Sequence, residues 1–219
     1  MTILDELRSN DIVAGLIKRG NQHLGMIGFT DHGSIHLAVV SKLSGEILAK
    51  LGYDKKLCEL AEIAGYLHDM GNVINRNGHS QSGALIAVKI LKRIGMPADE
   101  IAVIAAAIGN HDEGSGHPIS EVAAALILAD KSHVHRNRVR NPDLANFDIH
   151  DRVNYAVESS ILNIDEERKI IALQISIDND ICPVMDYFEI FLHRMLLCRR
   201  ASDFLGCEFQ LIINGVKLL

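Results

Sequence analysis

Six side chains of the types that bind divalent metal ions follow one another along the first 130 residues: His36, His68, Asp69, His79, His111 and Asp130. Apolar residues accompany them at steps of three and four, which is the spacing of one helix face. An imidazole or carboxylate on a buried face raises the free energy of the fold unless it is paired or coordinates a metal. One such histidine is usually a hydrogen-bonded core residue. Five successive apolar faces that each carry a ligand type favour a shared metal site instead.

The types and number of these ligands restrict the metal. Histidine nitrogen with aspartate oxygen, and no cysteine among them, suits iron, manganese, zinc, cobalt or nickel. Six ligands exceed the three or four that proteins supply to a single hydrolytic ion. We therefore expect one or two divalent transition metal ions, with iron or manganese favoured. Two ions acting together on a phosphate would lie about 3.5–4 Å apart.

The same apolar periodicity predicts the helices that must position the ligands. Apolar residues recur at helical spacing over residues 36–51, 57–68, 79–94, 104–111 and 123–130. Gly52 follows the first of these segments, and Gly95-Met96-Pro97 follows the third, as helix stops often do. Ser120 stands where the last helix needs an N-cap. A bundle of these helices would bring the six side chains together in its interior.

The sequence pattern changes towards the C-terminus. Residues 137–151 are polar, and beyond them apolar positions alternate over residues 153–161 and again over 171–177, a period that predicts two strands. Residues 183–205 fit a long helix and 209–213 a third strand, before the turn signal Asn214-Gly215. We therefore expect a mainly α protein, with a helical domain over residues 1–145. A small α+β unit, strand-strand-helix-strand, would occupy residues 146–219.

Composition restricts the class of partner. The net charge is −6, which argues against nucleic acid as a general partner. The four cysteines form no Cys-x-x-Cys pair and are expected to be reduced. The N-terminus lacks the pattern of a signal peptide, and no apolar run is long enough to cross a bilayer. These features predict a cytoplasmic protein with no membrane partner.

Several short motifs resemble those of HD-domain metal-dependent phosphohydrolases. His36, Leu67-His68-Asp69-Met70-Gly71 and Leu128-Ala129-Asp130 resemble the ordered H…HD…D signature of that superfamily, and Thr30-Asp31-His32-Gly33 is a phrase found in it. His79 to Ala84 looks like the extra-histidine helix of the six-ligand, dinuclear branch. Residues 110–118 are similar to a stretch of the HD-GYP phosphodiesterases, and the spacing of His79, His111 and Asp130 resembles the symmetrical diadenosine-tetraphosphate hydrolases. The resemblance covers about residues 25 to 140.

This resemblance implies an all-helical HD-domain bundle, and it assigns the six ligands to two metal ions. His36, His68, Asp69 and Asp130 would hold the first metal, and Asp69 would bridge to a second held by His79 and His111. Metal-activated water would then cleave a phosphoester or phosphoanhydride of a phosphorylated small molecule, with a nucleotide as the expected substrate.

Three positions depart from the family pattern. Asn72 stands where many relatives carry Lys or Arg after His-Asp-x-Gly, and Asn110 replaces the first histidine of a pair. His117 stands where HD-GYP proteins have tyrosine, so we do not expect a cyclic-dinucleotide phosphodiesterase.

Other residues are candidates for substrate contact. Lys131, Arg136 and Arg138 could bind phosphate oxygens, or could simply form a solvated helix end. Asp112 could protonate a leaving oxygen or cap a helix. His117 could touch substrate from its glycine-rich loop. Together with Asp69, we take Asp112 and Lys131 as the catalytic candidates.

Three hypotheses follow. The first is a phosphohydrolase. The second is a catalytically weak module that binds metal and nucleotide, with a regulatory C-terminal unit, which Asn72 favours. The third is a structural oligomer in which metal only joins helices, and here the strand edges of the C-terminal unit would make a homodimer plausible.

Overall fold

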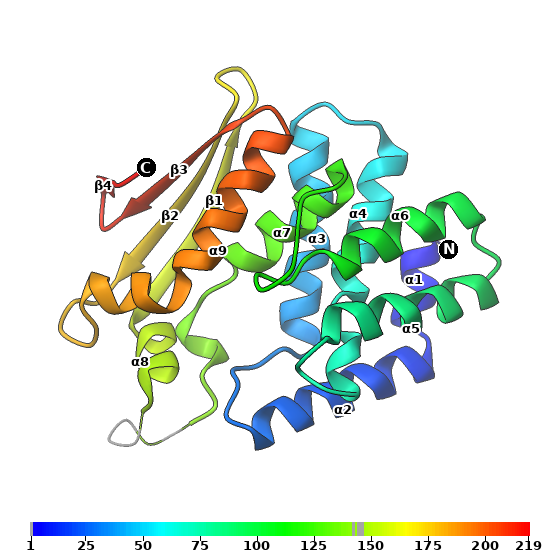
Figure 1. The fold of residues 1–219 in the computed structure, drawn as a ribbon, viewed down its shortest axis with the longest axis horizontal. Helices are drawn as coiled ribbons and strands as arrows, with labels where there is room; N and C mark the ends of the chain where they lie inside the picture. The colour runs from blue at the N-terminus through cyan, green and yellow to red at the C-terminus, as the bar shows by residue number, and fades with distance from the viewer. Residues whose placement is uncertain (1, 142, 144–146) are drawn as a thin grey trace.

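The helices of the chain gather on one side of a small C-terminal sheet (Figure 1). The computed structural model describes residues 2–141, 143 and 147–219. Its helices before the sheet are α1 (Ile3–Arg8), α2 (Asp11–Met26), α3 (Ser34–Lys50), α4 (Lys55–Leu67), the short 3₁₀ helix η1 (Met70–Val73), α5 (His79–Arg93), α6 (Ala98–Gly109), α7 (Glu121–Ser132), the 3₁₀ helix η2 (Arg136–Arg138) and α8 (Ile149–Ala156). The mainly α fold class is thereby confirmed.

Helix α7 lies at the centre of the bundle, where it packs against α3, α4, α6 and α9 (Figure 1). Every side chain from Val122 to Ala129 is fully buried. Three consecutive alanines, Ala123 to Ala125, allow neighbouring helices to approach closely on more than one face. The predicted N-cap is confirmed, because Ser120 Oγ accepts a hydrogen bond from the Ala123 amide at 3.1 Å. This central helix fixes the position of Asp130 near its C-terminal end.

Helices α3 and α4 pack as an antiparallel pair beside α7. A Cβ built on Gly65 would lie 2.7 Å from the Ser41 Cα, so the two backbones are nearly in contact. Ser41 Oγ donates a hydrogen bond to the Glu62 carbonyl at 2.7 Å across the same interface. The close approach brings the start of α3 and the end of α4 together, and these two ends carry His36 and His68.

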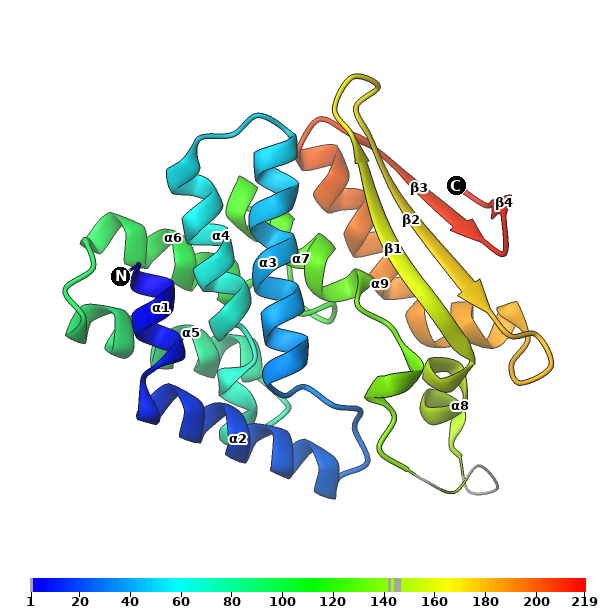
Figure 2. The same cartoon turned by 180° about the vertical axis from the view of Figure 1, so that it is seen from behind.

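The C-terminal part forms a four-stranded sheet in the order β1-β2-β3-β4. Its elements are β1 (Val157–Asp165), β2 (Ile170–Ile177), α9 (Val184–Phe204), β3 (Glu208–Ile213) and β4 (Val216–Lys217). The β1/β2 and β3/β4 pairs are antiparallel, whereas β2 and β3 are parallel and joined through α9. Figures 1 and 2 show α9 lying across one face of the sheet, and α9 also packs against α7.

One predicted strand begins too early. Val153 and Tyr155 belong to helix α8, and β1 starts only at Val157. Asp148 caps this helix by accepting a hydrogen bond from the Asp151 amide at 2.8 Å. Val153 and Ala156 are buried, which is helical spacing. The alternation of apolar residues therefore did not indicate a strand over residues 153–156.

The helical part and the C-terminal part share one hydrophobic core, which contains residues of α3, α4, α7, β2, β3 and α9. The boundary expected between residues 145 and 146 lies outside the described residues, so the division into two domains stays a prediction. None of the described helices is long and apolar enough to span a membrane.

Candidate metal centre

The six expected ligands converge in the middle of the bundle although five different elements supply them. His36 comes from the first turn of α3, His68 and Asp69 from the α4–η1 junction, and His79 from the start of α5. His111 lies just after α6, and Asp130 lies in the last turn of α7. Atoms of His36, His68 and Asp130 lie within 4.8 Å of one another, and so do atoms of His68, Asp69 and His111.

Three of the imidazoles are held in one orientation by the backbone that directly precedes them. The Nδ1 atoms of His68, His79 and His111 lie 2.8, 2.9 and 2.6 Å from the carbonyl oxygen three residues earlier in the chain. Because a carbonyl oxygen can only accept, each Nδ1 must carry the proton. In the neutral ring the lone pair is then on Nε2, which is the tautomer needed for a metal ligand.

The Nε2 atoms of His36, His68 and His79 lie near carboxylate oxygens, whereas His111 Nε2 lies 3.2 Å from His79 Nε2. His68 Nε2 is 3.3 Å from Asp69 Oδ2, and His36 Nε2 is 3.3 Å from Asp130 Oδ1. On the other side of Asp69, Oδ1 is 3.7 Å from His79 Nε2. Asp69 therefore lies between two groups of histidines, with one oxygen directed to each.

Some of these atoms are buried without a hydrogen-bond partner among the described residues: His36 Nε2, His68 Nε2 and Asp69 Oδ2. Buried polar atoms in folded proteins nearly always have a partner, so each such orphan needs an explanation. A divalent cation would satisfy all three at once. The residues present thus fit the metal that their types and order predicted.

Charge is unevenly distributed within the cluster. Burial acts against the charged imidazole, but the carboxylates of Asp69 and Asp130 outweigh it and raise the pKa of His68 to about 10. Burial and the nearby Arg138 lower the pKa of His36 to about 3. Burial opposes ionisation of Asp69 as well, yet His68 holds the pKa of that carboxyl well below its usual range. Without metal, a proton on His68 offsets part of the carboxylate charge. A divalent cation would displace that proton.

Asn72, the position where relatives often have a cation, contacts a carboxylate instead. Its Nδ2 donates to Asp69 Oδ1 at 2.7 Å and to the Asp69 carbonyl at 3.0 Å. Arg76 lies beside it, with Nη1 3.4 Å from Asn72 Oδ1 and 3.9 Å from Asp69 Oδ1. Asn72 therefore orients the carboxylate, and the positive charge missing at residue 72 is present at residue 76.

Lys131 is buried at the opposite side of the cluster. Its Nζ is 2.7 Å from Asp130 Oδ2 and 2.6 Å from Glu113 Oε2. Glu113 in turn accepts from Arg194 Nε at 3.0 Å. Arg194 belongs to α9, so this chain of ion pairs links the C-terminal part of the protein to the cluster.

A small cavity of about 10 Å³ touches the cluster and is lined by Asp69, His79, His111 and Asp130 together with His32, Arg76, Lys131, Arg138 and Arg194. Arg138, one of the expected substrate contacts, is only 7% exposed. Two of the expected residues, Lys131 and Arg138, therefore lie beside the predicted ligands, and their roles there stay predictions.

The remaining candidates lie further out. Asp112 Oδ1 is 4.0 Å from His79 Nε2, at the edge of the cluster. Arg136 pairs with Glu158 at 3.4 Å and stacks over Tyr155, and it does not line the small cavity. His117 is exposed on its loop and does not line that cavity either. Contacts of Arg136 and His117 with substrate are thus expectations that the geometry leaves without support.

Sequence reasoning missed some residues of the site. His133 Nδ1 lies 2.8 Å from His36 Nδ1, and its spacing of three residues from Asp130 could have indicated a place on the same side of α7. Arg76 precedes His79 by three residues at the start of α5. Arg194 had no local signal, because only the packing of α9 against α7 brings it to Glu113.

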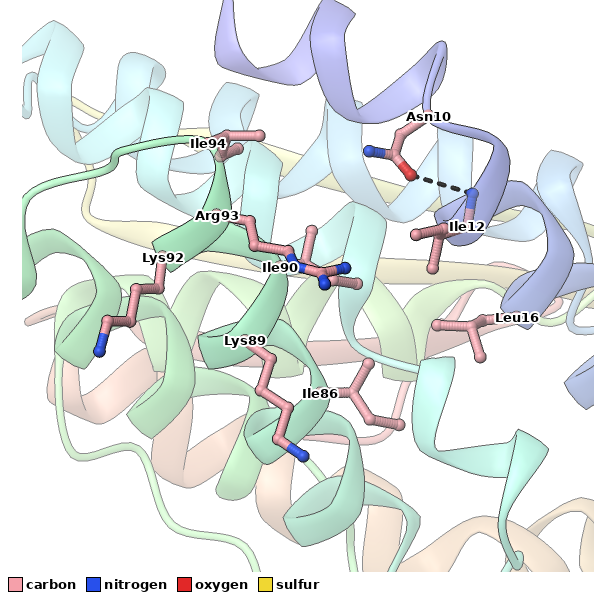
Figure 3. Close-up of a pocket in the computed structure, with 9 residues that line it drawn as sticks. All are labelled: Asn10, Ile12, Leu16, Ile86, Lys89, Ile90, Lys92, Arg93 and Ile94. Atoms are coloured by element: carbon pink, nitrogen blue, oxygen red, sulfur yellow. Dashed lines mark hydrogen bonds between the residues drawn. The ribbon is translucent and has the colours of Figure 1, made fainter.

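A larger cavity of about 660 Å³ lies elsewhere, between α2 and α5 (Figure 3). Its walls are formed by Ile12, Leu16, Ile86, Ile90 and Ile94, with Asn10, Lys89, Lys92 and Arg93 around them. Its lining includes no histidine or carboxylate among the residues that the structure describes. Size alone would favour this cavity as the active site, but its lining carries no group suited to metal binding or acid–base chemistry, so we place the chemistry at the histidine cluster.

Comparisons with known proteins agree with this choice. Residues 33–134 match the family model described as HD domain. The chain is 28% identical over 192 residues to an uncharacterized protein of Methanocaldococcus jannaschii, covering 77% of this chain and 73% of that protein. It is also 33% identical over 147 residues to a Ribonuclease Y of Mycoplasma mycoides, covering 64% of this chain and 31% of that protein. This chain thus spans less than a third of the ribonuclease.

All six predicted ligands lie within the matched segment. The resemblance noted from the motifs is therefore confirmed at the level of the superfamily. Residues 33–134 of this chain match the HD domain, the unit that characterises a superfamily of metal-dependent phosphohydrolases.

Proposed function

We propose that this protein is a divalent-metal-dependent phosphohydrolase that cleaves a phosphoester or phosphoanhydride bond of a nucleotide-like substrate. The observation that carries the proposal is the convergence of buried nitrogen and oxygen atoms of His36, His68 and Asp69 that have no hydrogen-bond partner among the described residues. A cluster that served only the fold would be expected to satisfy these atoms internally.

His36, His68, Asp69 and Asp130 would hold one ion, with Asp69 shared with a second ion at His79 and His111. Iron or manganese is favoured, and zinc, cobalt and nickel suit the same donors. When bound, such ions lower the pKa of water and neutralise charge on phosphoryl oxygens. The carbonyl bonds to Nδ1 fix three of the imidazoles before any metal arrives, which lowers the entropy lost on binding.

Neighbouring side chains would act directly on the substrate. Lys131 would place a positive charge next to Asp130 and attract a phosphoryl oxygen. Asp112, at the edge of the cluster, would donate a proton to the leaving oxygen. Arg138 would bind a phosphate oxygen from the cavity wall.

The similarity to proteins named Ribonuclease Y makes RNA a substrate that must be tested. The net charge of −6 favours a small nucleotide, because binding to a long phosphate backbone is driven largely by basic surface.

The test is phosphate or nucleotide release from a panel of nucleotides, dinucleoside polyphosphates, simple phosphoesters and a short RNA. It is run anaerobically with manganese, iron, cobalt, nickel and zinc. Asp69→Ala serves as the inactive control, and its helical circular dichroism should match the wild type. Release by the wild type alone is expected. Equal release by both proteins would contradict the assignment of the site.

A binding module with weak turnover is the second candidate. Asn72 favours it, since an amide rather than a cation contacts Asp69. In that case metal-loaded protein would bind nucleotide tightly and release no product with any metal. Fast turnover of any bound nucleotide would exclude this alternative.

A further inference from the structure

A second cavity, of about 300 Å³, lies between the HD domain and the C-terminal elements. We call it the outer cavity. Its lining includes Phe29 from the α2–α3 loop, Arg76 and Arg138 from the helical part, and Ile190, Phe191 and Arg194 from α9. Neither part of the chain forms it alone.

The outer cavity adjoins the metal cluster. Four of its lining residues also line the small cavity at the cluster: His32, Arg76, Arg138 and Arg194. These residues therefore separate the expected metal ligands on one side from the outer cavity on the other. A ligand in the outer cavity would meet the three arginines at its inner end, together with Glu113, which lines the same cavity and pairs with Arg194.

Arg138 has unusual surroundings for a buried cation. Its Nε donates to the Asp31 carbonyl at 2.9 Å and its Nη1 to the His133 carbonyl. It makes no ion pair with a carboxylate within the described part of the chain. The carboxylates of Asp130, Asp69 and Asp31 favour the charged form of Arg138 only from beyond ion-pair distance, so an anion bound in direct contact would stabilise it further. Arg138 is thus positioned to hold an anion at the junction of the two cavities.

Arg76 and Arg194 each lie over an aromatic ring. The Arg76 guanidinium carbon is 5.3 Å from the Phe29 ring centroid, and that of Arg194 is 4.5 Å from the Phe191 centroid. Such stacking keeps the planar group in place while leaving its N–H edges available to oxygens. The two phenylalanines with Ile190 also give the outer cavity an apolar wall.

Cations at the inner end and aromatic rings in the wall together suit a ligand with a phosphate and a flat apolar group. We infer that the outer cavity binds one nucleotide unit, its phosphate directed to Arg76, Arg138 and Arg194 and its base packed against the exposed ring of Phe29. The direction of the phosphate in this inference rests on the proposed function, which places the chemistry at the metal cluster beside the three arginines. A volume of about 300 Å³ lies at the small end of ligand pockets and accommodates a single nucleotide rather than a strand.

Binding is tested by equilibrium dialysis of metal-loaded protein with AMP, with inorganic phosphate and with a short oligoribonucleotide, and recovered AMP is checked for hydrolysis by chromatography. Phe29→Ala removes a ring that is 39% exposed, so the fold should tolerate it. Arg76→Gln removes one inner cation whose side chain is 18% exposed. Arg93→Gln, at the distant cavity between α2 and α5, makes the same change of charge and is the matched control.

Phe29→Ala should weaken AMP binding about tenfold and leave phosphate binding unchanged, since stacking on a base is worth about 1–3 kcal/mol. Arg76→Gln should weaken both ligands about tenfold or more, because it removes a charge-assisted hydrogen bond. Arg93→Gln should change neither. Tighter binding of the oligoribonucleotide than of AMP, or equal loss of AMP and phosphate in Phe29→Ala, would overturn the inference.

These outcomes are separable from those for the proposed function. AMP binding with the expected variant pattern, but no turnover of any substrate, would refute the hydrolase and keep the nucleotide pocket. Turnover of a simple phosphoester, with AMP bound no better than phosphate, would refute the pocket and keep the hydrolase.

Discussion

Gly71 is the position where one added carbon should separate the two halves of the candidate metal site. A Cβ built there would lie 1.9 Å from the His79 carbonyl oxygen and 2.6 Å from the Gly83 amide nitrogen. Both are backbone atoms of α5 and cannot rotate away. To reach 3.0 Å, the shortest contact that Cβ atoms tolerate, η1 and α5 must move apart by about 1.1 Å.

In Gly71→Ala, this movement would carry His79 away from Asp69. Metal–ligand distances tolerate only about 0.2 Å, so the group of His79 and His111 should lose most of its affinity for metal. Overpacking of this kind also lowers the free energy of unfolding, by about 1–3 kcal/mol. Both effects are expected from a single methyl group.

The assay combines metal content after dialysis with urea denaturation of the metal-free protein. Gly15→Ala is the control, because a Cβ at that exposed position in α2 meets nothing within 4 Å. It should leave metal content unchanged and raise the free energy of unfolding by about 0.5–1 kcal/mol. A Gly71→Ala protein with normal metal content and stability would refute the argument from backbone contact.

Three further predictions concern charge, metal and capping. Burial alone would raise the pKa of Glu113, but the charges of Lys131 and Arg194 outweigh it and hold the pKa below its usual value. The ionised carboxylate therefore stabilises the fold at any pH above about 4.5, and this stabilisation is lost progressively below pH 4.5. In urea titrations at pH 7, the free energy of unfolding of Glu113→Gln should therefore be about 2 kcal/mol lower than that of the wild type. This difference should become smaller towards pH 3, and a difference that stays constant with pH would contradict the reasoning. Metal at about 100 times its Kd should stabilise the wild type by about 2.7 kcal/mol, which raises the Tm by about 5–10 °C. The Tm of His111→Ala should rise by less. A wild-type Tm that neither chelator nor metal changes would argue against any metal site. Ser120→Ala should cost about 1 kcal/mol by loss of the α7 cap, with the exposed Ser115→Ala as a neutral control in the same urea titration.

The helical part of the fold was predictable because its residues obey one repeat throughout. The segments expected to end near His68 and Ile94 and to start near His79 do so within a few residues, because apolar residues recur at helical spacing along them. The shared position of the six ligands followed from the same repeat, because helices that bury those faces must bring them together.

Other features depend on contacts between distant segments and leave no local trace. Val153 and Tyr155 alternate like a strand, but the Asp148 cap and the burial of Val153 and Ala156 make this segment a helix. Arg194 reaches the site only because α9 crosses from the sheet to α7. Periodicity reports which face of an element is buried. It does not report which partner buries that face.

The path from Arg194 through Glu113 to Lys131 bears on how such a protein could change over evolutionary time. An HD domain alone would offer a metal centre open to many phosphates. Here the C-terminal elements add a cation and an aromatic wall to that centre. Exchange of α9 for another sequence, with the metal ligands left untouched, would then be expected to redirect specificity more than it alters the reaction. The C-terminal part would thus be the place where selection could adjust the choice of substrate.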